Sequence, residues 1–141
     1  MLKIRERIRN KCVEAIKRKI KFEETADVVS KDNLKYIGNY KCHLNSLSYA
    51  VKHSEKVKSI VGGIQIFSDD VVAHFIIELN TGEYIDVTYG NLAYALYEDF
   101  VIVKKWNWQE FNAGGELMSM KQYIYDLLPF HLKMLTNANE F

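Results

Sequence analysis

The stretch "VVAHFIIELNTGEYIDVTY", residues 71–89, decides the fold, because it predicts two strands and the turn that joins them. Apolar residues alternate with other residues on both sides of "NTG" (80–82), as they do in half-buried strands. The turn suits a three-residue loop with Gly82 in the left-handed conformation. Such a loop pairs Leu79 with Glu83 and extends this pairing along both strands.

This register determines which side chains share a face of the hairpin. The predicted core face carries Ala73, Phe75, Ile77, Leu79, Ile85, Val87 and Tyr89. The other face, which we expect to lie outside the core, carries His74 and Asp86 as diagonal neighbours, roughly 7 Å apart at the backbone. A loop one residue shorter or longer would move Asp86 to the core face. The hydrophobic pattern therefore favours the register that brings His74 and Asp86 together.

The elements around the hairpin predict an α+β domain. Strands are predicted at 63–67, 71–79, 83–89 and 100–106, with Gly62 and Gly63 as a break before the first of them. Helices are predicted at about 2–21, 42–53, 91–99 and 116–128, with a last helical turn after Pro129. We expect N-terminal helices packed on a small antiparallel sheet of about four strands, followed by C-terminal helices. The predicted single domain, 1–141, comprises a basic helix at 1–21, a core at 39–106 and C-terminal helices at 107–141.

Composition indicates a globular protein, with 48% apolar residues and one proline. No apolar run reaches the roughly 20 residues that cross a bilayer, and "MLKIRERIRNK" (1–11) lacks the apolar block of a secretory signal. Two cysteines, Cys12 and Cys42, do not indicate a disulfide framework. These features predict a cytoplasmic protein with reduced thiols and no membrane span, in the host cytoplasm if the protein is viral.

Charge is distributed unevenly along the chain. Residues 1–21 carry nine Lys or Arg and two Glu, a net charge of +7, whereas the remaining 120 residues carry ten basic and sixteen acidic side chains, a net charge of −6. The basic helix has an apolar stripe of Ile4, Ile8, Cys12, Ile16 and Ile20. It could bind nucleic acid or a membrane surface. We favour a helix packed by this stripe on the acidic domain, with Cys12 as a small core residue.

Cys42 begins the predicted helix 42–53, where the positive end of the helix dipole favours a thiolate. If this helix packs across the face that carries His74 and Asp86, the three side chains form a nucleophile, a base and an acid that orients the base. The alternative is that His74 and Asp86 are ordinary polar residues on a solvated face.

Other chemistry receives little support from the sequence. Cys42, His43, His53 and His74 do not have the spacing of zinc ligands, so no metal site is predicted. Gly62 and Gly63 lack the lysine and the spaced glycines of a phosphate loop. We therefore expect no cofactor.

The motifs "CHLNS" (42–46), "GGIQIF" (62–67), "AHFIIEL" (73–79) and "GEYIDVT" (82–88) resemble the papain-like cysteine peptidase superfamily. The transglutaminase-like and NlpC/P60-like branches are the most similar, as are uncharacterised bacterial and phage proteins with a Cys-His-x-Asn element, a His-bearing strand and an Asp-Val-Thr strand. The resemblance covers about residues 40–90 and implies a papain-like or transglutaminase-like core.

By this resemblance Cys42 is the nucleophile, His74 the general base and Asp86 the residue that orients His74. The oxyanion would be bound by the backbone N–H of Cys42 and one upstream donor. Papain-like enzymes have a glutamine six residues before the cysteine, where this chain has Tyr36. The remaining candidates for the oxyanion site or the pocket are Tyr36, Asn39, Tyr40, His43 and Asn45, and for Asn45 a structural hydrogen bond is favoured.

The resemblance implies a cysteine-dependent hydrolase or acyltransferase that acts on an amide bond of a protein or peptide. Peptidase, amidase and deamidase reactions share a Cys42 thioacyl intermediate, and the sequence does not separate them. One alternative is a catalytically inactive papain-like fold that serves as a phage or bacterial protein-binding (inhibitor) module. Another is nucleic-acid binding through residues 1–21, which would weaken steeply with salt. The oligomeric state is open.

Overall fold

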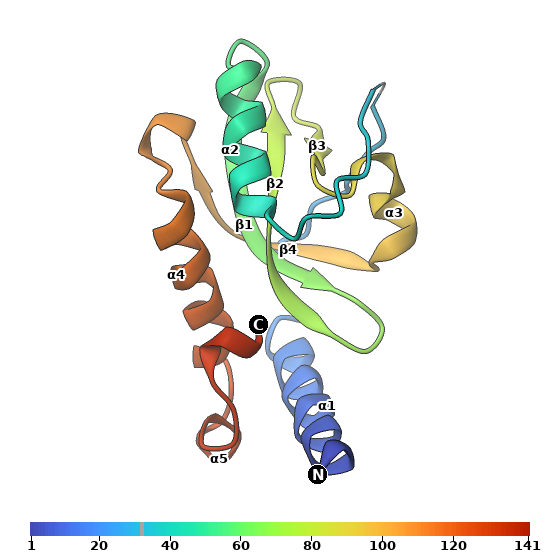
Figure 1. Ribbon diagram of the computed structural model, residues 1–141, viewed down its shortest axis with the longest axis vertical. Helices are drawn as coiled ribbons and strands as arrows, with labels where there is room; N and C mark the ends of the chain where they lie inside the picture. The colour runs from blue at the N-terminus through green and yellow to red at the C-terminus, as the bar shows by residue number, and fades with distance from the viewer. Residues whose placement is uncertain (32) are drawn as a thin grey trace.

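The computed structural model describes residues 1–31 and 33–141 (Figure 1). Along the chain, helices precede the strands of a sheet and further helices follow them. The longer helices are α1 (Leu2–Lys19), α2 (Cys42–Lys52) and α4 (Ala113–Asp126), and the strands are β1 (Val57–Ile66), β2 (Val71–Leu79), β3 (Tyr84–Ile85) and β4 (Asp99–Trp106). The short helices are η1 (Gly90–Leu92), α3 (Ala93–Leu96), η2 (Trp108–Glu110), α5 (Phe130–Lys133) and η3 (Ala138–Glu140). The predicted α+β class is confirmed.

The strands form one antiparallel sheet in the order β3-β2-β1-β4. β3 pairs with β2 in the predicted register, with Ile77 opposite Ile85 and Glu78 opposite Tyr84. The three-residue turn and the alternation of apolar side chains therefore determine the hairpin as expected.

The second strand of the hairpin is shorter than predicted, because β3 ends at Ile85 and not at residue 89. The side chain of the next residue, Asp86, accepts the backbone N–H groups of Thr88 (2.9 Å) and Tyr89 (2.8 Å). These hydrogen bonds bend the chain into a turn, as aspartate side chains commonly do. Among the described residues, the edge of β2 beyond the turn consequently has no partner strand.

β1 is longer than predicted and runs through Gly62 and Gly63, so the predicted break at these glycines was wrong. A Cβ atom at Gly63 would lie 1.9 Å from the backbone oxygen of Val101 on β4. The pairing of β1 with β4 shifts register at the same two glycines. Glycine is therefore used here for the close approach of two backbones within a sheet, and not to interrupt a strand.

The predicted core face of the sheet is buried under helices. Phe75 and Ile77 of β2 belong to one hydrophobic cluster with Ala50 of α2 and Ile124 of α4. Figure 1 shows α2 in front of the sheet and α4 beside it, to the left in this view. Cys42 belongs to this same cluster, so the first residue of α2 packs against the sheet.

The opposite face of the sheet, which was expected to lie outside the core, is also buried. Val61, Ile76 and Phe100 form a second hydrophobic cluster on that face. Residues 24–29 join the two edges of the sheet, since the N–H of Ala26 donates to Phe100 O on β4 and the N–H of Val29 to Tyr84 O on β3 (both 2.9 Å). This face carries too many apolar side chains to remain exposed to water.

Only part of α1 packs on the domain. Cys12, Ile16 and Ile20 are buried, as predicted, whereas Ile4 is 62% exposed. The Arg9 guanidinium fixes the middle of the helix, because it pairs with the Asp70 carboxylate and donates to the backbone oxygens of Val71 (3.0 Å) and Glu140 (2.6 Å). The predicted burial of the complete stripe was therefore wrong for Ile4 in the first turn, whereas Ile8 in the second turn is partly buried and packs against the core.

The other helix predictions hold in kind but differ in bounds. α4 begins at Ala113 and not at 116, and the predicted helix 91–99 divides into η1 and α3. α5 follows Pro129, as predicted. Within the two described ranges of the chain, no helix is both long and apolar enough to cross a membrane.

Candidate active site

Helix α2 occupies the open edge of β2 where β3 ends. The Ser46 hydroxyl donates to the backbone oxygen of Phe75 (3.3 Å), and the backbone N–H of Phe75 faces the Cys42 sulfur. Further along this edge, the N–H of Ala73 donates to the backbone oxygen of Phe141 (2.8 Å). The backbone N–H and C=O groups on this edge of β2, which a neighbouring strand would otherwise pair, are thus bound by α2 and by the C-terminal segment.

This placement corrects the expected route by which the thiol meets the imidazole. α2 packs on the face of Phe75 and not across the face of His74. Cys42 reaches His74 around the open edge of β2, at the first residue of α2. The short β3 is therefore a requirement of the site, because a strand paired as far as residue 89 would separate the two side chains.

The segment before α2 holds the helix start in place. The side-chain oxygen of Asn39 accepts the N–H of Lys41 (3.0 Å) and the side-chain amide of Asn45 (2.9 Å), which also donates to Thr88 Oγ1 (3.1 Å). Tyr40 has a φ angle of 56°, a left-handed conformation that costs a bulky residue of order 1 kcal/mol. This strained turn directly precedes the Lys41 N-cap, so that Cys42 begins the helix.

His74 and Asp86 form a buried pair. His74 Nε2 lies 2.7 Å from Asp86 Oδ2, and the two residues are 3% and 0% exposed. Tyr97 donates its hydroxyl to the same oxygen (3.0 Å), while the other carboxylate oxygen accepts the two turn N–H groups described above. Burial raises the pKa of Asp86, but the positive His74 and these donors outweigh it and lower the pKa below its ordinary value.

The thiol and the imidazole shift each other's pKa in opposite directions. Burial raises the pKa of Cys42, but the positive His74, hydrogen bonding with His43 and His74, and the N–H of Phe75 lower it to about 6. Burial lowers the pKa of His74, but Asp86 and the thiolate raise it to about 10. At neutral pH the pair is therefore a thiolate and an imidazolium, which is the reactive form of such a pair.

Aromatic rings hold the imidazole in one orientation. The ring centroids of Tyr89, Tyr97 and Phe100 lie 5.4, 6.1 and 6.2 Å from that of His74. Because Nε2 is bound to Asp86, the ring presents Nδ1 to the Cys42 side. Base, thiol and orienting carboxylate are thus fixed before any substrate binds.

A cavity of about 340 Å³ opens onto the pair. Cys42 and His74 line it together with Tyr36, Tyr40 and Tyr89. Of the residues predicted for the oxyanion site or the pocket, Tyr36 and Tyr40 therefore reach the cavity. Asn39, His43 and Asn45 are not among its described lining residues; the two asparagines bind each other, and His43 lies beside the sulfur.

Two residues of the site were missed by the sequence analysis. Nothing in the sequence indicated that the Tyr97 hydroxyl would reach Asp86. Gln65 is 1% exposed and lines the cavity, and its Nε2 has no acceptor among the residues that the structure describes. A signal for Gln65 did exist, since it interrupts the apolar strand "GIQIF" on the face that carries His74.

The Tyr97 hydrogen bond can be tested through stability. Removing its hydroxyl in Tyr97→Phe takes a donor from a buried carboxylate, so we expect a loss of about 2 kcal/mol in the free energy of unfolding. Tyr125→Phe is the matched control, because the Tyr125 hydroxyl donates to the neutral backbone oxygen of Lys133 (2.8 Å). Tyr125→Phe should lower the free energy of unfolding by only about 1 kcal/mol. Urea denaturation at pH 7 measures both, and equal losses would show that Asp86 does not depend on Tyr97.

Comparisons with protein-family models, with curated proteins and with solved structures found no match for this chain. The arguments for a function therefore come from the geometry and electrostatics of the site. These define a class of site: a thiol at a helix start, paired with a buried His–Asp couple beside a cavity.

Proposed function

We propose that the protein is a cysteine-dependent hydrolase or acyltransferase that acts on an amide bond. The observation that carries the proposal is the buried His74–Asp86 pair beside the Cys42 thiol, whose pKa of about 6 makes it a thiolate at neutral pH. The order of helix, strand and turn that bears these residues is also consistent with the resemblance to papain-like cysteine peptidases.

The reaction begins with attack of the Cys42 thiolate on the amide carbonyl carbon. The carbonyl π electrons move to oxygen, and the oxyanion accepts the N–H of Cys42, which lies at the start of α2 and has no intrahelical acceptor. The His74 imidazolium then gives its Nδ1 proton to the amide nitrogen as the C–N bond breaks. A thioester on Cys42 and a free amine result.

The second half of the reaction restores the enzyme. Water, or an amine in a transfer reaction, attacks the thioester and gives a proton to neutral His74. The C–S bond breaks, and its electron pair returns to sulfur as the thiolate. Asp86 keeps its negative charge throughout and stabilises the imidazolium that is present at the beginning and the end.

The cavity limits the substrate. A volume of about 340 Å³ accommodates one side chain and its carbonyl group, and not a large folded surface. We therefore propose a protein side chain or a peptide end as the acyl donor. The reaction requires Cys42 as a free thiol, and both cysteines are free in the structure, which is consistent with a reducing compartment such as the cytoplasm.

The chemistry can be tested before the substrate is known. With p-nitrophenyl acetate, we expect a burst of p-nitrophenol that matches the enzyme in amount, followed by slower turnover, and an acetyl group on Cys42 by mass spectrometry. The rate of the burst should rise with pH through about 6, as the thiolate forms. Amide turnover should fall above a pH of about 10, as His74 loses the proton that the leaving nitrogen needs.

Variants separate the site from general thiol reactivity. Cys42→Ala should abolish the burst, whereas Cys12→Ala should leave it unchanged, because burial raises the pKa of the Cys12 thiol. A peptide digest with hydroxylamine present, analysed by mass spectrometry, then distinguishes cleavage, deamidation and acyl transfer by their products. A burst that survives in Cys42→Ala, or no Cys42-dependent product, would favour an inactive fold that serves as a binding module.

A further inference from the structure

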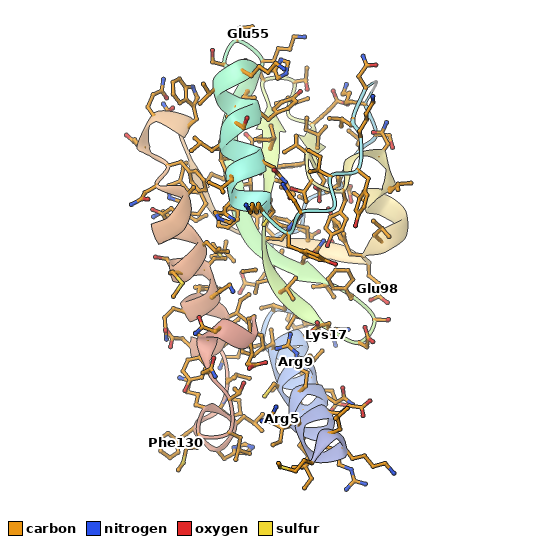
Figure 2. The ribbon with its side chains drawn as sticks, viewed as in Figure 1. Arg5, Arg9, Lys17, Glu55, Glu98 and Phe130 are labelled. Carbon is orange, nitrogen blue, oxygen red and sulfur yellow. The ribbon has the colours of Figure 1, made fainter. Side chains whose placement is uncertain are left out.

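One end of the molecule exposes several large apolar side chains. We define the α1/α5 end by Leu2, Ile4, Phe130, Met134 and Leu135, which are 56–87% exposed. Figure 1 shows the first turns of α1 and the short helix α5 at the same end of the molecule. Figure 2 places Arg5 and Phe130 there and Glu55 at the opposite end.

The same end is rich in positive charge. Lys3, Arg5, Arg7 and Lys133 lie within or beside the apolar group, and residues 127–137 contain no Asp or Glu. None of these four cations forms a salt bridge with any described residue. Their charge is thus available to an external partner.

The helix that carries this end is firmly mounted. Cys12 and Ile16 are buried in the core, and the Arg9 side chain is held by Asp70 and by two backbone oxygens. The first turns of α1 therefore project from a fixed base, and docking through them requires no folding step. A preorganised surface of this kind loses little entropy on binding.

Apolar side chains mixed with cations fit an anionic lipid bilayer better than they fit other partners. In a bilayer, the aliphatic and aromatic side chains enter the acyl boundary while lysine and arginine bind headgroup phosphates. A nucleic acid would use the cations but leave five apolar side chains in water. A second copy of the chain would bring two positively charged helices together without compensation.

We propose that the α1/α5 end docks the protein on an anionic membrane surface, with Ile4, Phe130 and Leu135 inserted at the interface. This surface is separate from the Cys42 cavity, and the proposal stands on exposure and charge alone. It also gives a reason for the exposure of Ile4 at the beginning of the isoleucine stripe of α1.

The experiment is sedimentation of the full chain with lipid vesicles. We expect binding to vesicles with about 30% phosphatidylserine in phosphatidylcholine, weak binding to phosphatidylcholine alone, and a marked loss of binding at about 0.5 M salt. Phe130→Ser combined with Leu135→Ser should weaken binding by roughly 100-fold, because each side chain contributes about tenfold through burial of apolar area. Lys3→Glu combined with Arg5→Glu should remove the preference for anionic lipid.

Matched controls lie at the opposite end of the molecule. Val51→Ser and Lys52→Glu change an exposed apolar residue and an exposed cation of α2 near Glu55, and should leave vesicle binding unchanged. Cys42→Ala should bind vesicles like the wild type, so failure of the proposed chemistry would not affect this result. Circular dichroism confirms that each variant is folded.

Three results would overturn the proposal. The first is vesicle binding that persists in the Phe130/Leu135 variant. The second is tight binding to duplex DNA or RNA that depends on Lys3 and Arg5 but not on Phe130. The third is a concentration-dependent dimer, seen by analytical ultracentrifugation without vesicles, that Phe130→Ser converts to monomer.

Discussion

Replacing His74 with alanine should raise the pKa of the Cys42 thiol from about 6 to its ordinary value of 9.0 or above. The reason is that burial of the thiol alone raises its pKa, and the positive His74 is the largest opposing cause. The change should appear as a shift of the midpoint of the pH profile for alkylation of Cys42, measured peptide by peptide with mass spectrometry.

The expected change in rate follows from two opposing effects. At pH 6 a shift of about three pKa units leaves roughly 500-fold less thiolate, but the more basic thiolate is about 20-fold more nucleophilic. Alkylation of Cys42 at pH 6 should therefore slow by about 25-fold. The midpoint is the safer measurement, because it does not depend on this partial cancellation.

Two references accompany the measurement. His131→Ala removes an exposed histidine and should leave the profile of Cys42 unchanged. Cys12 in the same protein should label slowly in every variant as long as the fold is intact, because it is buried. An identical, slow alkylation of Cys42 in the wild type and in His74→Ala would exclude the ion pair and with it the proposed enzyme.

Substitution of Gly63 by alanine should destabilise the fold by about 3 kcal/mol or more, because the new Cβ would collide with backbone. This atom would lie 1.9 Å from Val101 O and 2.9 Å from the Phe100 ring. Backbone of the neighbouring strand cannot move aside without breaking the pairing of β1 with β4. Urea denaturation followed by tryptophan fluorescence measures the loss.

Two other glycines provide graded controls. A Cβ at Gly62 would meet the Trp106 ring at 2.7 Å and the Met120 methyl at 2.9 Å, and these side-chain atoms can shift. Gly114 in α4 has open space around it, so alanine there should be neutral or slightly stabilising, by up to about 1 kcal/mol. The expected order of destabilisation is Gly63→Ala, then Gly62→Ala, then Gly114→Ala, and any other order would contradict this account of β1.

The hairpin register could be predicted because its causes are local. The alternation of apolar residues and the "NTG" turn act within a few residues of each other, and a slip by one residue would expose the core face. The same logic placed His74 and Asp86 within reach, and the structure gives 2.7 Å between their side chains. The start of α2 at Cys42 was likewise visible in the helical spacing that follows it.

Features that depend on distant segments were not predictable in this way. The rings of Tyr89, Tyr97 and Phe100 around His74, and the Tyr97 hydroxyl on Asp86, come from segments that follow the hairpin. The irregular sequence of residues 24–29 likewise did not indicate that they join the two edges of the sheet. The glycines of β1 were mistaken for a break, because the groups that exclude a side chain there come from elsewhere in the chain: the backbone of β4 at Gly63, and the Trp106 and Met120 side chains at Gly62. Gln65 and Tyr97 could be assigned to the site only when both were seen beside His74 and Asp86.

By itself, the sequence determined the α+β class, the hairpin and the presence of a thiol, an imidazole and a carboxylate in chain order. Only the tertiary structure decided that the three meet, because α2 occupies the edge that the short β3 leaves open. The tertiary structure also decided that Cys42 and His74 form a charged pair, since a pKa depends on burial and on neighbours brought from other parts of the chain. Periodicity is a property of consecutive residues, whereas electrostatics at a buried site is a property of packing.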